Sequence, residues 1–395
     1  MSQSSRPRLT LRRHKAEALR RFHPWVFSGA IQRSEGDLAD GAVVEVYDDE
    51  GEFLAVGHYG SGSIAVKVLA FEPVEDMQAL LQARLEAAYA LRQQVGLTEN
   101  PQTNCYRLVN AEGDGLPGLI IDWYNGVAVM QAHSLGMYQQ RQGIVEALQA
   151  IYGARLTALY DKSAPQLFRK SDQVDEYLLG ESSTGEVLEN GHRFLVDWET
   201  GQKTGFFLDQ REHRALLGRY AQGQKVLNSF CYSGGFSVYA LQAGARQVDS
   251  VDTSVKAIDW TKENITRNPE VSGVHAAFTE EVFPFLKDCD ADYDVIVLDP
   301  PAFAKSQSAR HQAVMAYKRL NQLAIAKLRP GGLLFTFSCS QVVLPEYFNG
   351  AVMAGAIEAG RPVKILHHLT QPPDHPISIY HPEGLYLKGL VLRVD

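Results

Sequence analysis

Residues 225–245 read KVLNSFCYSGGFSVYALQAGA, and this stretch decides the fold. KVLNSF has the apolar content of a short buried strand, and the residues after the two glycines have the composition of a helix. The glycine-rich turn between them lets the backbone approach a ligand closely. It lacks the GxGxxG spacing of dinucleotide-binding proteins, and a purely structural tight turn would look the same.

The same alternation of strand and helix continues on the C-terminal side of this stretch. Strands are expected at KVLNSF (225–230), QVDSVD (247–252), VHAAF (274–278), YDVIVLD (293–299) and GLLFTFS (332–338). Helical stretches lie between them. This pattern predicts an α/β fold with a parallel, doubly wound sheet, and ligands of such sheets bind at the carboxyl ends of the strands.

Two further sections precede the sheet. The first, residues 1–73, is predicted to be a small β unit with strands at 43–48, 53–59 and 64–71, separated by DDEG and GSGS turns. The second, residues 74–185, is predicted to be a small α+β domain with helices over 76–95 and 137–151 and strands near 107–110, 118–123, 127–132 and 157–161. A hairpin over 185–198 leads into the last domain, residues 186–395.

The composition of the 395 residues is that of a globular protein, with 45% hydrophobic and 21% charged residues. No apolar run approaches the roughly 18–20 residues of a membrane span. No apolar segment follows the basic N-terminus, so no signal peptide is expected. The four cysteines lack CxxC spacing, which argues against a disulfide framework or a zinc site and favours the cytoplasm.

The formal net charge of −8 argues against a nucleic-acid partner, but the charge is unevenly distributed. The N-terminal segment contains Arg6, Arg8, Arg12, Arg13, Lys15, Arg20, Arg21 and Arg33, opposed up to Arg33 only by Glu17. Such a local excess can bind phosphates on an otherwise acidic protein. A solvated basic arm without a partner is the alternative.

The ends of two strands narrow the choice of cofactor. Asp252 ends the second strand, where a carboxylate can accept hydrogen bonds from both ribose hydroxyls of NAD or S-adenosylmethionine. The fourth strand ends in DPPAFAKS (299–306), which a dehydrogenase does not need. The Asp299 side chain and the Pro300 carbonyl can accept hydrogen bonds from a base edge, and Phe303 can stack on the ring. These residues favour an enzyme that methylates a planar amine or base.

The motifs together resemble the bacterial 23S rRNA cytosine-5 methyltransferase I family over essentially the whole chain. The resemblance rests on KTGFFLDQREHR (203–214), CYSGGFS (231–237), SVDTS (250–254), DPPAFAKS (299–306) and PGGLLFTFSCS (330–340). HPWVFSGAI (23–31) resembles the start of that family's PUA domain, an RNA-binding β barrel, and YRLVNAEGDGLPGLIIDWY (106–124) resembles its middle domain. The resemblance implies a class I (Rossmann-like) methyltransferase sheet after these two domains.

The resemblance implies that S-adenosylmethionine is the cofactor. Its methionine end would lie in the turn after the first strand, and Asp252 would hold its ribose. Glu281 stands near the expected adenine, where the family usually has the shorter Asp. Lys203 to Arg211 would pack beside the cofactor and the substrate entrance, although a helix cap and ordinary surface charge would also explain Asp209, Gln210 and Arg211. The implied cofactor-binding residues are Phe230, Tyr232, Ser233, Gly234, Gly235, Asp252, Thr253, Glu281, Asp299 and Gln210.

The resemblance also gives a role to Cys339, at the end of the strand FTFSCS (335–340). C5 of a pyrimidine is a poor nucleophile, and addition of a thiolate to C6 makes it an enamine carbon that can attack a methyl group. Cys339 would be that nucleophile, and Asp299 would hold the base or remove the C5 proton. Without the motifs, a cysteine after an apolar strand is more often a packing residue. Pro301 stands where many such enzymes have a second cysteine, so one cysteine is implied.

The implied partner is 23S rRNA, naked or partly assembled into the large subunit, with no membrane and with homodimerisation left open. The residues expected to contact RNA are Pro300, Pro301, Phe303, Lys305, Arg211, Arg12, Arg13, Arg20 and Arg21. Three other functions stay open. The first is guanine N-methylation, for which related enzymes use the DPPxF motif without a covalent step. The second is a noncatalytic RNA-binding protein, which would need none of this chemistry. The third is a nicotinamide oxidoreductase, which the absent GxGxxG disfavours.

Overall fold

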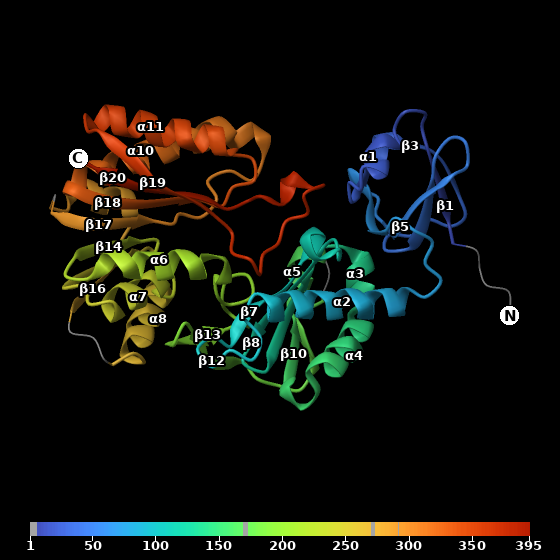
Figure 1. The fold of residues 1–395 in the computed structure, drawn as a ribbon, viewed down its shortest axis with the longest axis horizontal. Coiled ribbons are helices and arrows are strands. Elements are labelled where there is room, and N and C mark those ends of the chain that lie inside the picture. The colour runs from blue at the N-terminus through green and yellow to red at the C-terminus, as the bar shows by residue number, and fades with distance from the viewer. Residues whose placement is uncertain (1–5, 169–172, 270–272, 291) are drawn as a thin grey trace. The chain divides into compact units, whose positions relative to one another are not determined.

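The computed structural model describes residues 6–168, 173–269, 273–290 and 292–395, which form two compact units (Figure 1). Unit 1 comprises Met1–Gly185, Val196–Phe206 and Pro373–Gly384. Unit 2 comprises Glu186–Leu195, Phe207–Pro372 and Leu385–Asp395. Two segments from the second half of the chain therefore belong to unit 1. The division into three domains at residues 73 and 185 stays a prediction.

The first part of unit 1 is a six-stranded sheet in the order β2-β6-β5-β4-β1-β3. Its strands are β1 (Arg8–Leu11), β2 (Trp25–Phe27), β3 (Ile31–Glu35), β4 (Val43–Tyr47), β5 (Phe53–Tyr59) and β6 (Ile64–Ala70), with the one-turn helix α1 (Glu17–Arg20). Leu9, Val44, Val46 and Val66 are fully buried in its core. The three predicted strands are confirmed, and β1 to β3 were missed because their short apolar runs lie in the basic segment.

A second sheet in unit 1 has the order β11-β10-β9-β8-β7. Its strands are β7 (Cys105–Asn110), β8 (Leu119–Tyr124), β9 (Val127–Ala132), β10 (Ala158–Asp161) and β11 (Glu176–Leu179). Helix α2 (Met77–Gln94) begins where the Asp76 carboxylate accepts hydrogen bonds from two backbone amides, and it packs against α4. The single helix predicted over 137–151 is two helices, α3 (Leu135–Gln139) and α4 (Arg141–Tyr152); the short helix α5 spans Ala164–Leu167.

The segment Pro373–Gly384 is held in unit 1 by hydrogen bonds to this second sheet and to α2. Arg92 donates from Nη2 to the Asp374 carbonyl oxygen over 2.7 Å, and the Arg107 amide donates to the Asp374 carboxylate over 3.1 Å. The side-chain amide of Asn110 donates to the Pro376 carbonyl oxygen over 2.9 Å. This insertion between two strands of unit 2 is therefore a fixed part of unit 1.

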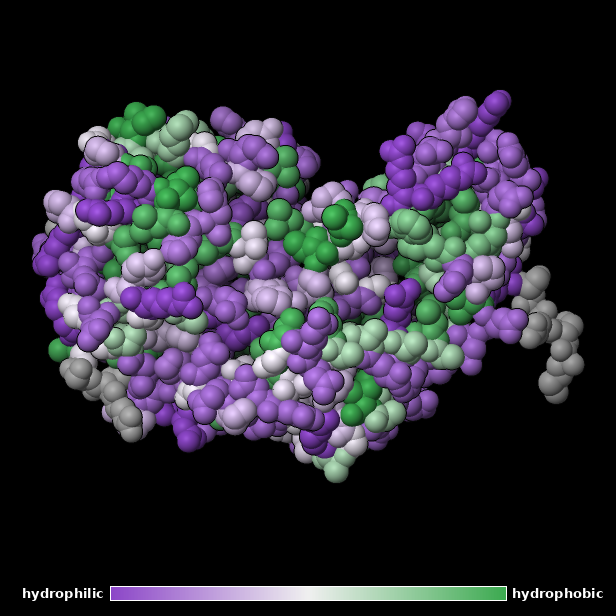
Figure 2. Space-filling view, in the orientation of Figure 1, coloured by the Kyte–Doolittle hydropathy of each residue, from purple (hydrophilic) through white to green (hydrophobic). Residues whose placement is uncertain are grey.

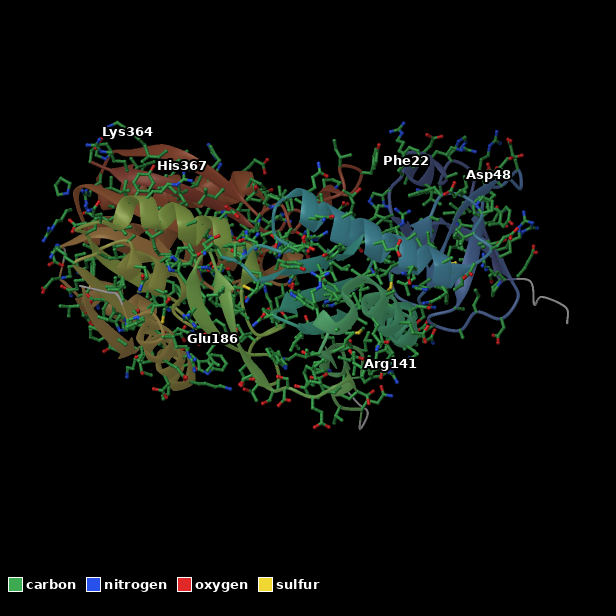
Figure 3. All side chains as sticks on the ribbon, turned by 60° about the horizontal axis from the view of Figure 1, so that its bottom comes forward. Phe22, Asp48, Arg141, Glu186, Lys364 and His367 are labelled. Carbon is green, nitrogen blue, oxygen red and sulfur yellow. The ribbon has the colours of Figure 1, made fainter. Side chains whose placement is uncertain are left out.

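Unit 2 is built on a seven-stranded sheet in the order β16-β15-β14-β17-β18-β20-β19. Its strands are β14 (Lys225–Ser229), β15 (Gln247–Asp252), β16 (Val274–Thr279), β17 (Tyr293–Leu298), β18 (Leu328–Ser338), β19 (Val363–Thr370) and β20 (Lys388–Val394). All five predicted strands are confirmed, and they are parallel to one another. The sheet as a whole is mixed, because β20 runs antiparallel to β18 and to β19. Strand β19, which carries Lys364 and His367 (Figure 3), is a largely exposed edge strand without an apolar run that would have predicted it.

Helices cover both faces of this sheet, with α10 and α11 on one face and α6 and α7 on the other (Figure 1). The helices of unit 2 are α6 (Arg211–Ala221), α7 (Gly235–Gln242), α8 (Val255–Thr266), α9 (Val282–Asp288), α10 (Arg310–Lys327) and α11 (Pro345–Ala359). The predicted hairpin is the pair β12 (Thr184–Glu189) and β13 (His192–Asp197). Short 3-10 helices occur at Ser28–Ala30, Ala111–Asp114, Gly153–Arg155, Leu208–Gln210, Gln307–Ala309 and Pro382–Gly384.

The strand order reverses between β14 and β17, which is the position where open α/β sheets bind ligands. Because β14 to β18 are parallel, their carboxyl ends meet at one edge of the sheet. The segments that follow these strands, at 230–235, 252–254, 280–281, 299–306 and 339–344, therefore share this edge. It contains most of the residues that the sequence singled out.

A buried ion pair packs against the turn after β14. Arg214 of α6 donates from Nε and Nη2 to the two carboxylate oxygens of Glu189, over 2.8 and 2.6 Å, and both side chains are almost fully buried. The Tyr239 hydroxyl of α7 donates to the same carboxylate over 3.0 Å. The pair therefore joins the hairpin, α6 and α7 into one scaffold.

Replacing Glu189 with alanine is expected to lower the free energy of unfolding by about 3–5 kcal/mol, because it removes the bidentate partner of a buried guanidinium. Equilibrium denaturation with urea measures the change. The control is Glu186→Ala on the same strand, whose exposed carboxylate (Figure 3) pairs with Arg193 and Arg267 and is worth about 1 kcal/mol or less. Equal losses in the two variants would contradict the prediction.

Candidate active site at the carboxyl edge of the sheet

The turn after β14 has an unusual backbone that α8 holds in place. Phe230 and Tyr232 have φ angles of +59° and +47°, in the left-handed region that non-glycine residues rarely adopt. Two side chains of α8 donate to carbonyl oxygens of the turn: Thr261 to Tyr232 over 3.0 Å and Asn264 to Ser233 over 2.8 Å. Strained backbone that the surrounding structure enforces is typical of ligand-binding loops.

The two glycines of this turn are required by contacts within the protein. A Cβ on Gly234, which has a φ of +77°, would lie 2.7 Å from Cγ2 of Thr261. A Cβ on Gly235 would lie 2.8 Å from Cδ of Arg214, and atoms this close would force the structure to shift. The structural explanation of the glycine pair therefore holds at both positions, and a close approach of a ligand to these glycines stays a prediction.

Asp252, at the end of β15, ties this strand to the turn. Its two carboxylate oxygens accept hydrogen bonds from the backbone amides of Tyr232 over 3.0 Å and Ser254 over 2.9 Å. The side chain is only half-buried, and each oxygen keeps a further lone pair for another donor. Thr253 is exposed beside it, and the exposed Glu281 precedes α9 after the end of β16. These side chains follow the order of the strands along the edge.

A hydrogen-bonded chain leads from α6 to Asp299. The Nδ1 atom of His213 donates to Oε1 of Gln210 over 2.5 Å, and Nε2 of Gln210 donates to Oδ1 of Asp299 over 2.9 Å. Burial lowers the pKa of His213 to about 4, so the imidazole is neutral near pH 7 and its Nδ1 carries the proton. The chain therefore fixes the orientation of the Asp299 carboxylate without adding a charge.

The segment Asp209–Arg211 is inside the protein. All three side chains are almost fully buried, so the alternative that they are ordinary surface charges is wrong. Gln210 stands at the N-cap position of α6 but forms no capping hydrogen bond. Asp209 accepts a hydrogen bond from the Tyr386 hydroxyl over 2.7 Å, and Nε of the buried Arg211 lies 3.3 Å from Oε1 of Glu212. The expected contact of Arg211 with RNA stays a prediction.

Cys339 follows the end of β18 and lies against the loop that follows β17. Its Sγ is 3.9 Å from the Pro300 carbonyl oxygen, and the side chain is partly exposed. The next residue, Ser340, donates from its hydroxyl to the Ala304 carbonyl oxygen over 2.7 Å, which joins the two loops. The structure therefore brings together the thiol and the proline motif that the sequence assigned to one site.

The other three cysteines have different surroundings. Cys231 is buried beside Thr261, and burial raises the pKa of its thiol to about 12. Cys105 is fully buried in the second sheet of unit 1. Cys289 is partly exposed, but it follows α9 and precedes β17, and it therefore lies toward the amino edge of the sheet. Their positions therefore do not make any of these three cysteines a candidate nucleophile.

The residues of the motif DPPAF differ in their exposure to solvent. Pro300 is buried, Pro301 is exposed, and Phe303 is half-buried with its ring 4.8 Å from that of Tyr317 of α10. Lys305 is exposed at the end of the motif. Part of the Phe303 ring is thus used for packing, and its stacking on a base stays a prediction.

Sequence reasoning missed Lys388, the first residue of β20. Its ammonium group donates to the carbonyl oxygens of Ser340 over 2.6 Å and Tyr386 over 3.0 Å, one residue from the thiol of Cys339. Burial lowers the pKa of Lys388 to about 8, and interaction with the charge of Cys339 acts in the opposite direction. The only signal in the sequence is a lysine at the start of the apolar run GLVLRV, which resembles an ordinary surface lysine.

The predicted phosphate contacts of the basic segment lie in unit 1. Arg12, Arg13, Arg20 and Arg21 are exposed, and a hydrophilic surface covers α1 and β3 (Figure 2). Arg20 is 2.6 Å from the buried carboxylate of Asp48, which Figure 3 labels, and Arg21 is 3.8 Å from Glu17. Asp48 therefore offsets part of the basic charge. In the sequence, Glu17 was the only acidic residue assigned to this role.

Comparisons with known proteins agree with this geometry. A family model described as S-adenosylmethionine-dependent methyltransferase matches residues 107–393, and a PUA-like domain model matches residues 9–71. The chain is 39% identical over 407 residues to "Ribosomal RNA large subunit methyltransferase I" of Klebsiella pneumoniae, covering all of both chains. It belongs to this methyltransferase family. The protein of the same name from Citrobacter koseri is 40% identical over 98% of this chain and 99% of its own.

A solved structure of a protein assigned as a methyltransferase, in complex with S-adenosylhomocysteine (SAH), has the same fold. It superimposes with a TM-score of 0.84 at 24% identity over 98% of this chain and all of its own. The expected α/β methyltransferase fold with a PUA-like N-terminal domain is therefore confirmed. None of the helices in the described ranges is long and apolar enough to span a lipid bilayer.

The family membership makes S-adenosylmethionine the cofactor, as the sequence predicted, and the residues at the carboxyl edge fit it. Asp252 offers unused carboxylate lone pairs to ribose hydroxyls, and the strained turn at 230–235 offers a rigid backbone surface beside it. The contacts of individual residues with the cofactor, including those of Phe230, Thr253, Glu281 and Gln210, stay predictions.

Replacing Asp252 with asparagine is expected to weaken binding of SAH by about 10- to 100-fold, because hydrogen bonds to a charged acceptor contribute roughly 1.5–3 kcal/mol. Asparagine keeps one acceptor oxygen for the backbone of the turn. Isothermal titration calorimetry with SAH gives the dissociation constants. Asp259→Asn, an exposed position on α8, is the matched control and should leave the affinity unchanged. An unchanged affinity of the Asp252 variant would remove this residue from the cofactor site.

Proposed function

We propose that the protein transfers a methyl group from S-adenosylmethionine to C5 of a cytidine in 23S ribosomal RNA. The named relatives, which are 39–40% identical over their full length, support ribosomal RNA of the large subunit as the substrate. The observation that carries the choice of cytosine C5 is the partly exposed thiol of Cys339, 3.9 Å from the carbonyl oxygen of Pro300. N-methylation needs no thiol at this position, whereas C5 methylation does.

The proposed chemistry assigns the covalent step to Cys339. Its thiolate adds to C6 of the cytosine, which breaks the C5–C6 double bond and gives C5 the electron density of an enamine carbon. The bound cofactor supplies an electrophilic methyl group on its sulfonium. After C5 is methylated, loss of the C5 proton to a base re-forms the double bond and expels the thiolate of Cys339. The enzyme is thereby returned to its starting state.

Asp299 and Pro300 are proposed to hold the base. The Asp299 carboxylate and the Pro300 carbonyl oxygen are acceptors, as the exocyclic amino group of cytosine requires. The chain His213–Gln210–Asp299 keeps the carboxylate in one orientation, so its position is set before the RNA binds. Asp299 is also the proposed acceptor of the C5 proton. Pro301 and the exposed side of Phe303 would bound the base on its other sides.

RNA binding is proposed to involve the PUA-like domain as well as the catalytic edge. Phosphate contacts fix the register of an RNA strand, while the extruded base carries the chemistry. Arg12 and Arg13 are exposed and form no ion pair among the described residues, so they are the strongest candidates for phosphate contact in this domain, and Lys305 is the candidate beside the active site. We assign these roles to residues 1–73 and 186–395, with residues 74–185 as a separate middle domain.

Incubation with S-adenosylmethionine and undermodified 23S rRNA, followed by nucleoside mass spectrometry, is expected to yield 5-methylcytidine. Cys339→Ala should reduce the rate by about three orders of magnitude or more, as loss of a covalent nucleophile does. It should still bind SAH, because the cofactor residues are intact. Cys289→Ala, at the other partly exposed cysteine, should remain fully active.

Three outcomes would overturn the proposal. A methylguanosine product would assign the enzyme to N-methylation, with Asp299 and Pro300 holding a guanine. Full activity of Cys339→Ala would show that the thiol is a packing residue. Absence of any methylated nucleoside, with SAH binding intact, would favour the noncatalytic RNA-binding function.

A further inference from the structure

Lys388 is a buried cation at the candidate active site. It pairs with Ser338 across the β18–β20 ladder, and only 6% of its surface is exposed. Its ammonium group donates to two carbonyl oxygens, those of Ser340 and Tyr386. Burying a charged amine costs free energy unless an opposite charge compensates it. The position of Lys388 therefore requires a physical reason.

Carbonyl oxygens solvate this ammonium, and no carboxylate among the described residues neutralises it. Within the described residues Lys388 forms no ion pair, although the protein has many, including the buried pair of Arg214 with Glu189. The residue between its ladder partner Ser338 and its carbonyl partner Ser340 is Cys339. The acidic group whose charge acts on this cation is the thiol of Cys339, which the proposed function uses as nucleophile.

We propose that Lys388 is the counterion of the Cys339 thiolate and keeps this thiol ionised near neutral pH. The inference rests on the proposed function only for the use of that thiolate in catalysis. Lys388 is a positioning residue in this scheme, because it acts on Cys339 and takes no part in bond making. An ordinary cysteine has a pKa near 8.5 and is mostly protonated at pH 7, and a neighbouring ammonium favours the charged form.

The other titratable groups at this edge include Tyr317 of α10, which interacts with the charge of Cys339, and Asp299, which precedes Pro300. Arg211 and His213 of α6 are also buried in unit 2, and the Arg211 guanidinium is paired with the Glu212 carboxylate, 3.3 Å away. His213 is neutral, because burial lowers its pKa to about 4, and burial raises the pKa of Tyr317, which keeps its phenol neutral. A charged Asp299 would oppose ionisation of the thiol. The ammonium of Lys388 offsets this repulsion.

The two groups titrate as a pair. Burial lowers the pKa of Lys388 to about 8 even though the charge of Cys339 acts in the opposite direction, so the amine begins to lose its proton just above neutral pH. The thiolate of Cys339 favours the charged ammonium, and the ammonium favours the thiolate to the same extent. Near neutral pH the lysine keeps its proton and the thiol releases one to solvent. The ion pair is the expected state over the range in which the enzyme works.

The rate of alkylation of Cys339 by iodoacetamide measures its ionised fraction without RNA or cofactor. Mass spectrometry of the peptide that contains Cys339, sampled across a series of pH values, gives the profile for this residue alone. In the unmodified protein the rate should reach half its maximum clearly below pH 8.5. A half-maximum at or above that value would overturn the proposal, whether or not any variant folds.

Lys388→Met keeps the length and the apolar stem of the side chain and removes the charge. We expect its alkylation profile to move to higher pH by about one unit, which makes Cys339 about tenfold less reactive at pH 7. Lys388→Arg should retain most of the reactivity, and Cys289 in the same samples is the internal control. Binding of SAH confirms that each variant is folded. A folded Lys388→Met variant with an unchanged profile would falsify the counterion role.

The pH dependence of methylation separates this inference from the proposed function. If both hold, the acidic limb of the kcat profile shifts to higher pH in Lys388→Met, and raising the pH restores part of the activity. If Cys339→Ala is active while the alkylation shift is observed, the ion pair stands and the nucleophile assignment fails. If the enzyme needs Cys339 but the alkylation profiles coincide, the proposed function stands and the role of Lys388 fails.

Discussion

The buried ion pair of Arg214 with Glu189 is the interaction on which the arrangement of unit 2 depends. It joins the β12–β13 hairpin to α6, and the Arg214 side chain lies so close to Gly235 that only a glycine fits there. The turn after β14 is therefore built directly on this guanidinium. Gln210, at the N-cap position of α6, donates from its side chain to Asp299. The turn after β14 and the Asp299 carboxylate are thus both positioned by side chains of residues 210–214.

The carboxyl edge of the sheet shows how parallel strands combine residues that are distant in the sequence. Asp252, Asp299 and Cys339 each follow a different strand, and the parallel register brings the strand ends to the same level. Lys388 reaches the same edge from the other direction, because β20 is antiparallel and begins where β18 ends. A strand that starts at the active edge can supply a side chain from its first residue. This explains why a mixed sheet places an ammonium beside a thiol.

Much of unit 2 could be predicted from the sequence, because its five parallel strands are apolar runs bounded by turns and its motifs stand at their ends. The partnership of Cys339 with DPPAF was predictable for the same reason. Lys388 was not, since nothing in a local pattern shows that a lysine at a strand start will be buried. The burial of Asp209 to Arg211 was also hidden, because charged residues usually indicate a surface. The interruption between α3 and α4 at Gln140 and the assignment of Pro373–Gly384 to unit 1 depend on tertiary contacts. Local sequence periodicity does not predict such contacts.

The position of β20 in the sheet has a consequence for folding during synthesis. This strand follows the other six strands of the sheet along the chain, yet it lies inside the sheet, between β18 and β19. Before reaching it, the chain leaves unit 2 and forms the Pro373–Gly384 segment of unit 1. A nascent chain cannot insert β20 until this strand has left the exit tunnel of the ribosome, after every other strand of the sheet. Closure of the sheet, and with it the pairing of Lys388 beside Cys339, is therefore a late step in folding.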